Sequence, residues 1–88
     1  MSRVIHKIAL EKQVTTITVP DGSFRVLEVH QQNDIPTIWF ERAKDVYIKR
    51  EVTFLMVPTG GEVPENFSHI GTVFLQNTSL VYHVYMND

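Results

Sequence analysis

Seven short stretches of alternating or β-branched apolar residues, separated by turn-forming residues, occupy nearly all of this chain. Alternation with a period of two is typical of a β-strand, because successive side chains of a strand point to opposite faces. No segment has the i, i+3, i+4, i+7 apolar pattern of a helix longer than about two turns. The pattern predicts strands over residues 4–10, 14–19, 24–31, 37–42, 46–57, 71–76 and 80–86.

The lengths of the strands and turns indicate the fold class. At 88 residues the chain has room for one hydrophobic core, so we expect a single β domain spanning residues 1–88. Short strands joined by short turns favour antiparallel pairing. We therefore predict an all-β fold, a compact antiparallel sandwich or partly open barrel of about seven strands, in which residues 64–67 could add one short helical turn.

Two details of the strands are also predicted. Strict alternation in the third strand places Val29 on the same face as Leu27 and opposite Val26. The first half of the fifth strand is charged, which indicates that this strand either projects beyond the core or carries a β-bulge at residues 49–51.

Several chemistries are not expected. The chain has no cysteine, which excludes disulfides, thiolate metal sites and cysteine nucleophiles. The four histidines, His6, His30, His69 and His83, lie on separate segments without metal-binding spacing, so no metal site is predicted. His83 is expected to be a half-buried, hydrogen-bonded structural residue. With neither a nucleophile elbow nor a recognisable carboxylate pair, we expect no enzymatic activity and no cofactor.

Charge and length bear on the partners of the chain. The net charge of −2 gives no bulk attraction to a nucleic-acid duplex or to an anionic membrane. No apolar run approaches the roughly 20 residues that span a bilayer. A chain of this size buries only a modest core. Because disulfides and a metal site are not expected, self-association is the expected additional source of stability. We therefore expect a cytosolic homo-oligomer.

The loop over residues 58–64 carries two glycines between two prolines. The N–H groups of Thr59, Gly60 and Gly61 follow a strand and could form an anion-binding nest. Alternatively, the glycines simply build a sharp corner. The segment is not a P-loop, because the trailing Lys-Ser/Thr is missing. His69 is the histidine expected nearest to this loop.

Three further residues are candidates for ligand binding. Arg42 and Arg50 flank one connection and could grip a phosphate or carboxylate in a bidentate manner. Acidic neighbours interleave with them, so an ordinary salt-bridged surface is the alternative. Trp39, between Ile38 and Phe40, is most simply a core residue, whereas an exposed indole would serve as an interface anchor or a stacking platform.

A series of short motifs in one order covers almost the whole chain, namely Ile5-His6-Lys7-x-x-Leu10, Val19-Pro20-Asp21-Gly22, Val26-Leu27-x-Val29-x-Gln31, Ile38-Trp39, Thr59-Gly60-x-x-Val63-Pro64, Ile70-Gly71-Thr72 and Leu80-Val81-x-His83-Val84-Tyr85. With these motifs the chain resembles a family of small, functionally uncharacterised bacteriophage proteins. The resemblance implies a phage origin, a β-rich domain and expression in the cytoplasm of the infected host. Relatives tend to have Gly-Thr-Gly-His where this chain has Pro58-Thr59-Gly60-Gly61, so the role of that histidine is not carried over to Gly61.

Two functions fit a small non-enzymatic phage protein. The first is an anti-defence role in which the protein sequesters a small anionic signal molecule of nucleotide type. The chain is too short to enclose a large pocket, so this site is expected between subunits. The second is inhibition or modulation of a host enzyme, bound through an exposed strand edge or an aromatic patch.

Overall fold

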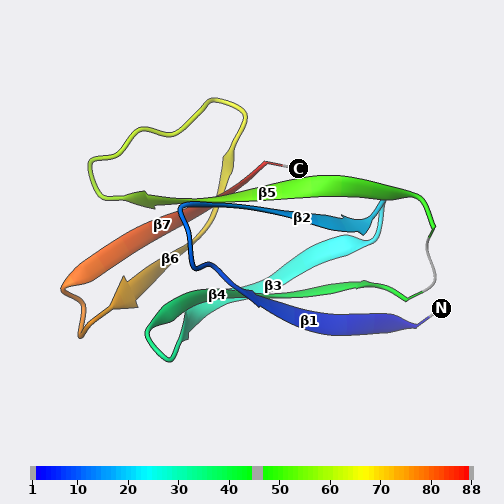
Figure 1. The fold of residues 1–88 in the computed structure, drawn as a ribbon, viewed down its shortest axis with the longest axis horizontal. Coiled ribbons are helices and arrows are strands. Elements are labelled where there is room, and N and C mark those ends of the chain that lie inside the picture. Colours follow the sequence, from blue (N-terminus) through cyan, green and yellow to red (C-terminus); the bar gives the residue numbers. More distant parts are fainter. Residues whose placement is uncertain (1, 45–46, 88) are drawn as a thin grey trace.

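The computed structural model describes residues 2–44 and 47–87 as seven strands in two antiparallel sheets (Figure 1). The strands are β1 Arg3–Ala9, β2 Val14–Pro20, β3 Phe24–Gln32, β4 Ile35–Ala43, β5 Lys49–Pro58, β6 Ser68–Leu75 and β7 Leu80–Asn87. One sheet has the order β1-β4-β3 and the other the order β2-β5-β7-β6. These residues contain no helix, and so none that could cross a membrane. The predicted all-β fold is confirmed.

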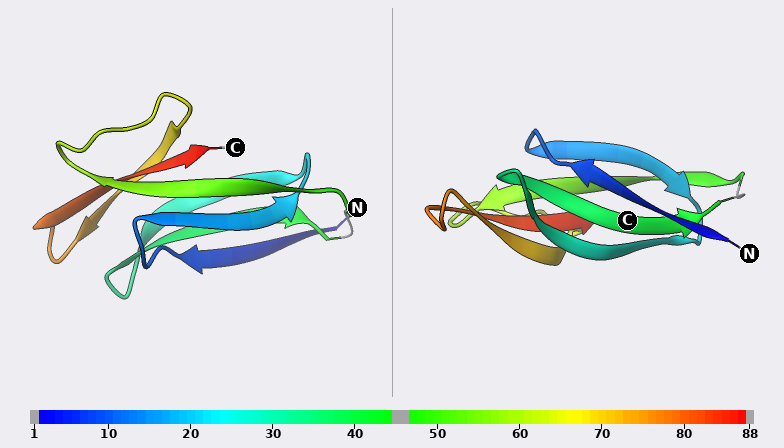
Figure 2. Two further views of the ribbon diagram at one scale, coloured as in Figure 1. Left: turned by 45° about the horizontal axis from the view of Figure 1, so that its top comes forward. Right: turned by 90° about the horizontal axis from the view of Figure 1, so that it is seen from below.

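The core lies between the two sheets, whose layers are visible in Figure 2. Alternate residues of the central strands β4 and β5 point inward, as the period of two requires. Phe54 of β5 stacks at 6.4 Å from Phe24 of β3, and Phe24 lies 5.2 Å from Phe40 of β4 (ring centroids). The buried core cluster comprises Leu10, Val19, Val29, Ile38, Phe40, Val52, Phe54, Met56, Val73, Leu75 and Val84.

The strands do not carry a bulge where the sequence indicated one. Residues 49–55 of β5 pair with β2 without interruption, so the predicted bulge at 49–51 is wrong. Lys49 and Glu51 are exposed on the outer face, and the inward Arg50 lies at the sheet end, where its Nε is 3.4 Å from the Asp21 carboxylate. Charge is thus accommodated at the rim of a regular sheet.

Bulges lie instead in the two strands at the seam between the sheets. The register shifts between Val26 and Glu28 in β3 and between His69 and Gly71 in β6. Because the extra residue reverses the alternation, Val26 and Val29 pair with the inward-facing Phe40 and Ile38 and share the core face. The strict alternation predicted for β3 therefore holds up to Val26 and is wrong from Leu27 onward.

Element ends differ from the prediction by a few residues. The fourth strand begins at Ile35 and the sixth at Ser68, while Val46 of the predicted fifth strand lies outside the described residues. Residues 64–67 form a turn closed by the Phe67 N–H, which donates to the Pro64 carbonyl at 3.3 Å, and not a helical turn. A single turn lacks the repeated bonds that stabilise a helix.

The edge strands β3 and β6 approach closely at one glycine. A Cβ built on Gly71 would lie 2.7 Å from the Cβ of Val29, which is closer than two carbon atoms can pack. Glycine at this position therefore lets the backbone of β6 lie against β3. The close approach brings side chains of the two outer faces to a common seam, where the candidate site lies.

Candidate functional site

Two histidines and two threonines form a continuous hydrogen-bonded chain on the outer face of the four-stranded sheet. Thr59 Oγ1 lies 3.0 Å from His83 Nε2, and Thr72 Oγ1 lies 3.2 Å from His83 Nδ1. The Thr72 hydroxyl also lies 3.0 Å from His69 Nε2. We call these four residues the His–Thr chain. His69 and Thr59 at its ends are exposed, and the two middle residues are half-buried.

The sheet register positions this chain. Thr72 of β6 and His83 of β7 are direct cross-strand partners, and His69 is opposite Tyr85. The rings of His69 and Tyr85 meet edge to face with centroids 5.3 Å apart, which fixes the plane of the His69 imidazole. Thr59 reaches the chain from the loop after β5, so the chain ties three segments together.

The loop reaches His83 because a tight turn follows β5. The Gly61 N–H donates to the Pro58 carbonyl at 2.9 Å, and Gly60 takes φ of +93° at the third position of this turn. A Cβ on Gly61 would lie 2.6 Å from Val57 Cγ1, so the loop lies directly on the outer face of β5. The Gly61 amide is occupied by the turn, which leaves the Thr59 hydroxyl as the group that the loop contributes to the chain.

The hydrogen bonds of the chain can run in two directions. In one, Thr59 donates to His83 Nε2, His83 Nδ1–H donates to Thr72, and Thr72 donates to His69 Nε2. In this direction the free Nδ1–H of His69 donates outward. In the other direction every bond is reversed and the Thr59 hydroxyl donates outward. One additional proton on His83 makes both ends donors at the same time.

A groove of about 140 Å³ lies along the seam beside the chain and is lined by His30, Gln31, Thr72, Val73 and Phe74. His30 Nδ1 accepts from the Gln31 N–H at 2.8 Å, which leaves its Nε2–H as a donor. Gln31 Oε1 accepts from the Asp34 N–H at 2.9 Å, so its amide NH₂ also remains a donor. Thr72 belongs to both the groove and the His–Thr chain.

The structure brings together some of the sequence candidates and separates others. Thr59 and His69 both belong to the chain, at its opposite ends. The histidine that contacts the loop is His83 and not the expected His69, because the Thr59 hydroxyl bonds to His83 Nε2. Arg50 lies at the opposite end of β5, about 30 Å from the loop at strand rise. Arg42 at the end of β4 bonds to the Ala43 carbonyl at 3.2 Å. Neither arginine is part of the seam.

Trp39 is not a core residue, contrary to the simplest prediction. It is half-buried on the outer face of the three-stranded sheet, opposite Lys7 on β1 and Glu28 on β3. Ile38 and Phe40 take the inward positions because side chains alternate along β4. On the same outer face, Glu41 pairs with Arg3 at 3.3 Å and with Arg25 at 3.7 Å.

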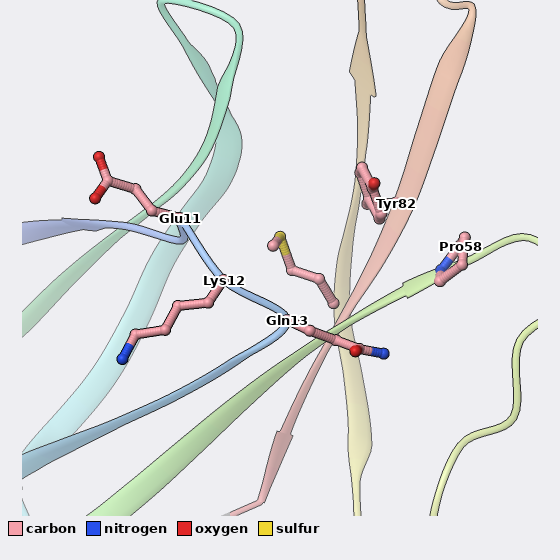
Figure 3. Close-up of a pocket in the computed structure, with 6 residues that line it drawn as sticks. Glu11, Lys12, Gln13, Pro58 and Tyr82 are labelled. Atoms are coloured by element: carbon pink, nitrogen blue, oxygen red, sulfur yellow. The ribbon is translucent and has the colours of Figure 1, made fainter.

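A larger cleft of about 380 Å³ lies at the end of the sandwich, on the other side of the four-stranded sheet from the His–Thr chain (Figure 3). It is lined by Glu11, Lys12, Gln13, Met56, Pro58 and Tyr82. In Figure 3 the charged ends of Glu11 and Lys12 point away from Tyr82, whereas the Gln13 side chain extends toward Pro58. The cleft therefore combines the apolar groups of Met56 and Pro58 with the Gln13 amide and the Tyr82 hydroxyl. We call it the end cleft.

Metal binding finds no support in the described parts of the chain. Across residues 2–44 and 47–87, no group of three or more His, Asp or Glu side chains is arranged to hold a metal ion. The His–Thr chain offers two imidazoles, and structural metal sites commonly use four ligands.

Comparison with known proteins shows the family. A family model described as a domain of unknown function, DUF7352, matches residues 1–88. The chain belongs to the DUF7352 family. No curated protein and no solved structure matches the chain. Membership in DUF7352 agrees with the predicted resemblance to an uncharacterised family.

Sequence reasoning missed Thr72 and treated His83 as structural. The signal that could have found them is the hairpin of β6 and β7. If Leu75 and Leu80 are the pair that closes the hairpin, then in an antiparallel pairing the residue three before Leu75 faces the residue three after Leu80, which places Thr72 opposite His83. The sequence indicated a turn at residues 77–79 but did not determine this register.

Proposed function

We propose that this DUF7352 protein is a non-enzymatic phage accessory protein that binds a small anionic molecule of nucleotide type in the cytoplasm of the infected host. The observation that carries the proposal is the His–Thr chain, which presents a donor at one of its two ends and shares Thr72 with a groove lined by further donors. Sequestering a nucleotide signal of bacterial defence would make the protein an anti-defence factor.

The donors at the seam match a phosphate group. His30 and Gln31, which line the groove beside Thr72, each keep an N–H donor that the bonds above do not use. A groove of about 140 Å³ suits one charged group, because pockets that enclose drug-sized ligands have roughly 300–1,000 Å³. Phe74, with 55% of its surface exposed, lies beside the groove and offers a face on which a base can stack.

Binding without turnover is supported by the partners of the two imidazoles. A catalytic imidazole is commonly oriented by a carboxylate. Within the described segments, the hydrogen bonds of His69 and His83 go to threonine hydroxyls. This arrangement holds the rings in place without the carboxylate that commonly orients a catalytic imidazole.

Replacing Thr72 with valine tests the proposal, because it interrupts the chain at its middle and keeps the side-chain shape. We expect Thr72→Val to weaken binding of inorganic phosphate and of a nucleoside monophosphate by about 10- to 100-fold, the value of one or two lost charge-assisted hydrogen bonds. Isothermal titration calorimetry measures both affinities.

Thr53→Val is the matched control. Thr53 lies on the same outer face and its hydroxyl also pairs with a threonine, Thr16 Oγ1 at 3.0 Å, but it is not part of the His–Thr chain. This variant should bind both probes within about twofold of the unaltered protein. Equal affinities for Thr72→Val and Thr53→Val, or no binding of either probe by the unaltered protein, would contradict the proposal.

A second candidate function is favoured by one observation. The outer face of the three-stranded sheet carries the half-buried Trp39 together with Ile5 and Leu27, which have 63% and 39% of their surfaces exposed. An aromatic side chain beside exposed aliphatic groups is typical of a protein-binding surface. Binding of a host enzyme through this face is the alternative if the anion titrations are negative.

A further inference from the structure

Strand β2 forms a free edge of the four-stranded sheet. It pairs with β5 on one side, and β1 belongs to the other sheet. In the described ranges, no backbone hydrogen bond reaches the outer side of Val14 to Thr18. Exposed strand edges are templates for pairing with another strand, and proteins usually protect them with charges, proline or bulges.

The hydrogen bonds at both ends of β2 show which groups are free. The Met56 N–H donates to the Gln13 carbonyl at 2.9 Å, and the Asp21 N–H donates to the Ile48 carbonyl at 2.8 Å. Because the bonded residues of an antiparallel strand alternate, the odd-numbered residues of β2 bond toward β5. Val14, Thr16 and Thr18 therefore direct their N–H and C=O groups outward.

The sequence of this edge is uncharged and rich in β-branched residues. From Val14 to Val19 it reads Val-Thr-Thr-Ile-Thr-Val, whereas the other open edge, β1, carries Arg3, His6 and Lys7. Val14, Thr16 and Thr18 are exposed, and Pro20, which has no N–H, ends the free segment. The edge therefore lacks the charges that protect β1 against strand pairing.

We propose that β2 pairs with β2 of a second copy of this chain about a two-fold axis at Thr16. In this register Thr16 is opposite Thr16 of the second copy, and Val14 is opposite Thr18, so every outward N–H meets an outward C=O. From Val14 to Thr18 the edge is uncharged, so no like charges meet within this pair; beyond it, the same register places Lys12 opposite Pro20 and Glu11 opposite Asp21 of the second copy.

The pairing has consequences for the two sites. The two four-stranded sheets become one continuous sheet, and the two His–Thr chains lie on the same face. His83 is level with position 12 of β2, four residues from the axis, so the two chains are also displaced in opposite directions along the strands and lie about 36 Å apart. The end cleft, whose rim carries Lys12 and Gln13, comes to lie next to the Pro20–Asp21 turn of the second copy. The cleft thus becomes a site bordered by two subunits.

The test compares Thr16→Pro with Thr16→Val. Both variants lose the bond between the hydroxyls of Thr16 and Thr53, but only proline removes the outward N–H, which has no backbone partner among residues 2–44 and 47–87. Analytical ultracentrifugation should give the unaltered protein and Thr16→Val twice the 10.2 kDa mass of the chain. Thr16→Pro should raise the dissociation constant by about 100-fold.

Two further measurements keep the test decisive. Thr16→Lys leaves the backbone unchanged and places two ammonium groups opposite each other, so it should also give monomers even if the proline variant does not fold. In a mixed isotope-labelled sample, an NOE between the α-protons of Thr15 and Ile17 of different copies should appear, because these residues form a closely spaced, non-hydrogen-bonded pair in this register. A monomeric unaltered protein, or a dimer that persists in the Thr16→Lys variant, would overturn the proposal. The anion titrations test the proposed function and are independent of this measurement of oligomeric state.

Discussion

Phe54→Ala is expected to remove about 3–5 kcal/mol from the free energy of unfolding, the usual cost of deleting a buried phenylalanine ring. Phe54 is 1% exposed and connects the two sheets, because its ring lies against Phe24 of the opposite sheet, which in turn contacts Phe40. A domain of this size has a total stability of about 5–8 kcal/mol. The variant should therefore unfold at much lower urea concentration, as measured by circular dichroism.

Phe74→Ala is the matched control for this prediction. Phe74 lies on β6 with 55% of its surface exposed, so its truncation opens no cavity. We expect a change below about 1 kcal/mol. Similar losses for the two phenylalanine variants would contradict the two-layer core described above.

Gly71→Ala is expected to destabilise the protein by about 1–3 kcal/mol, the range typical of overpacking. The new Cβ would lie 2.7 Å from the Cβ of Val29, with the two Cγ atoms of Val29 at 3.1 and 3.2 Å, so β6 must move away from β3. The seam would widen, and the groove lined by His30 and Thr72 would change shape. Urea denaturation measures the stability, and phosphate titration reports the groove.

Gly60→Ala is the comparison for Gly71→Ala, because it changes the backbone conformational energy without a steric clash. Gly60 has φ of +93° and no atom within 4 Å of an added Cβ, so its substitution costs about 1–2 kcal/mol through backbone conformation alone. Adding Val29→Ala should offset part of the Gly71→Ala loss, because it removes both Cγ contacts, and should not offset the Gly60→Ala loss. Equal effects of Val29→Ala in the two backgrounds would show that the seam is not closed by this contact.

The sequence predicted the tight turn of the loop, because turn formation depends on residues that are neighbours in the chain. The two glycines and Pro58 indicated a tight corner, and the structure has a turn there with Gly60 in the left-handed region. The sequence indicated His69 as the histidine nearest this loop, whereas His83 makes the contact with Thr59. It did not separate Arg50 from this loop, although the rise of the predicted strand over residues 46–57 already places Arg50 about 30 Å from Thr59.

The sequence by itself determined the number of strands, their antiparallel pairing and most of their inward faces, because a period of two and turn chemistry are local properties of the chain. The tertiary structure decided the bulges at Leu27 and Ile70, the outward position of Trp39 and the meeting of Thr59, Thr72 and His83. These features depend on register, and a shift of one residue moves every following side chain to the other face. Register is set by contacts between strands far apart in the sequence, such as Gly71 against Val29.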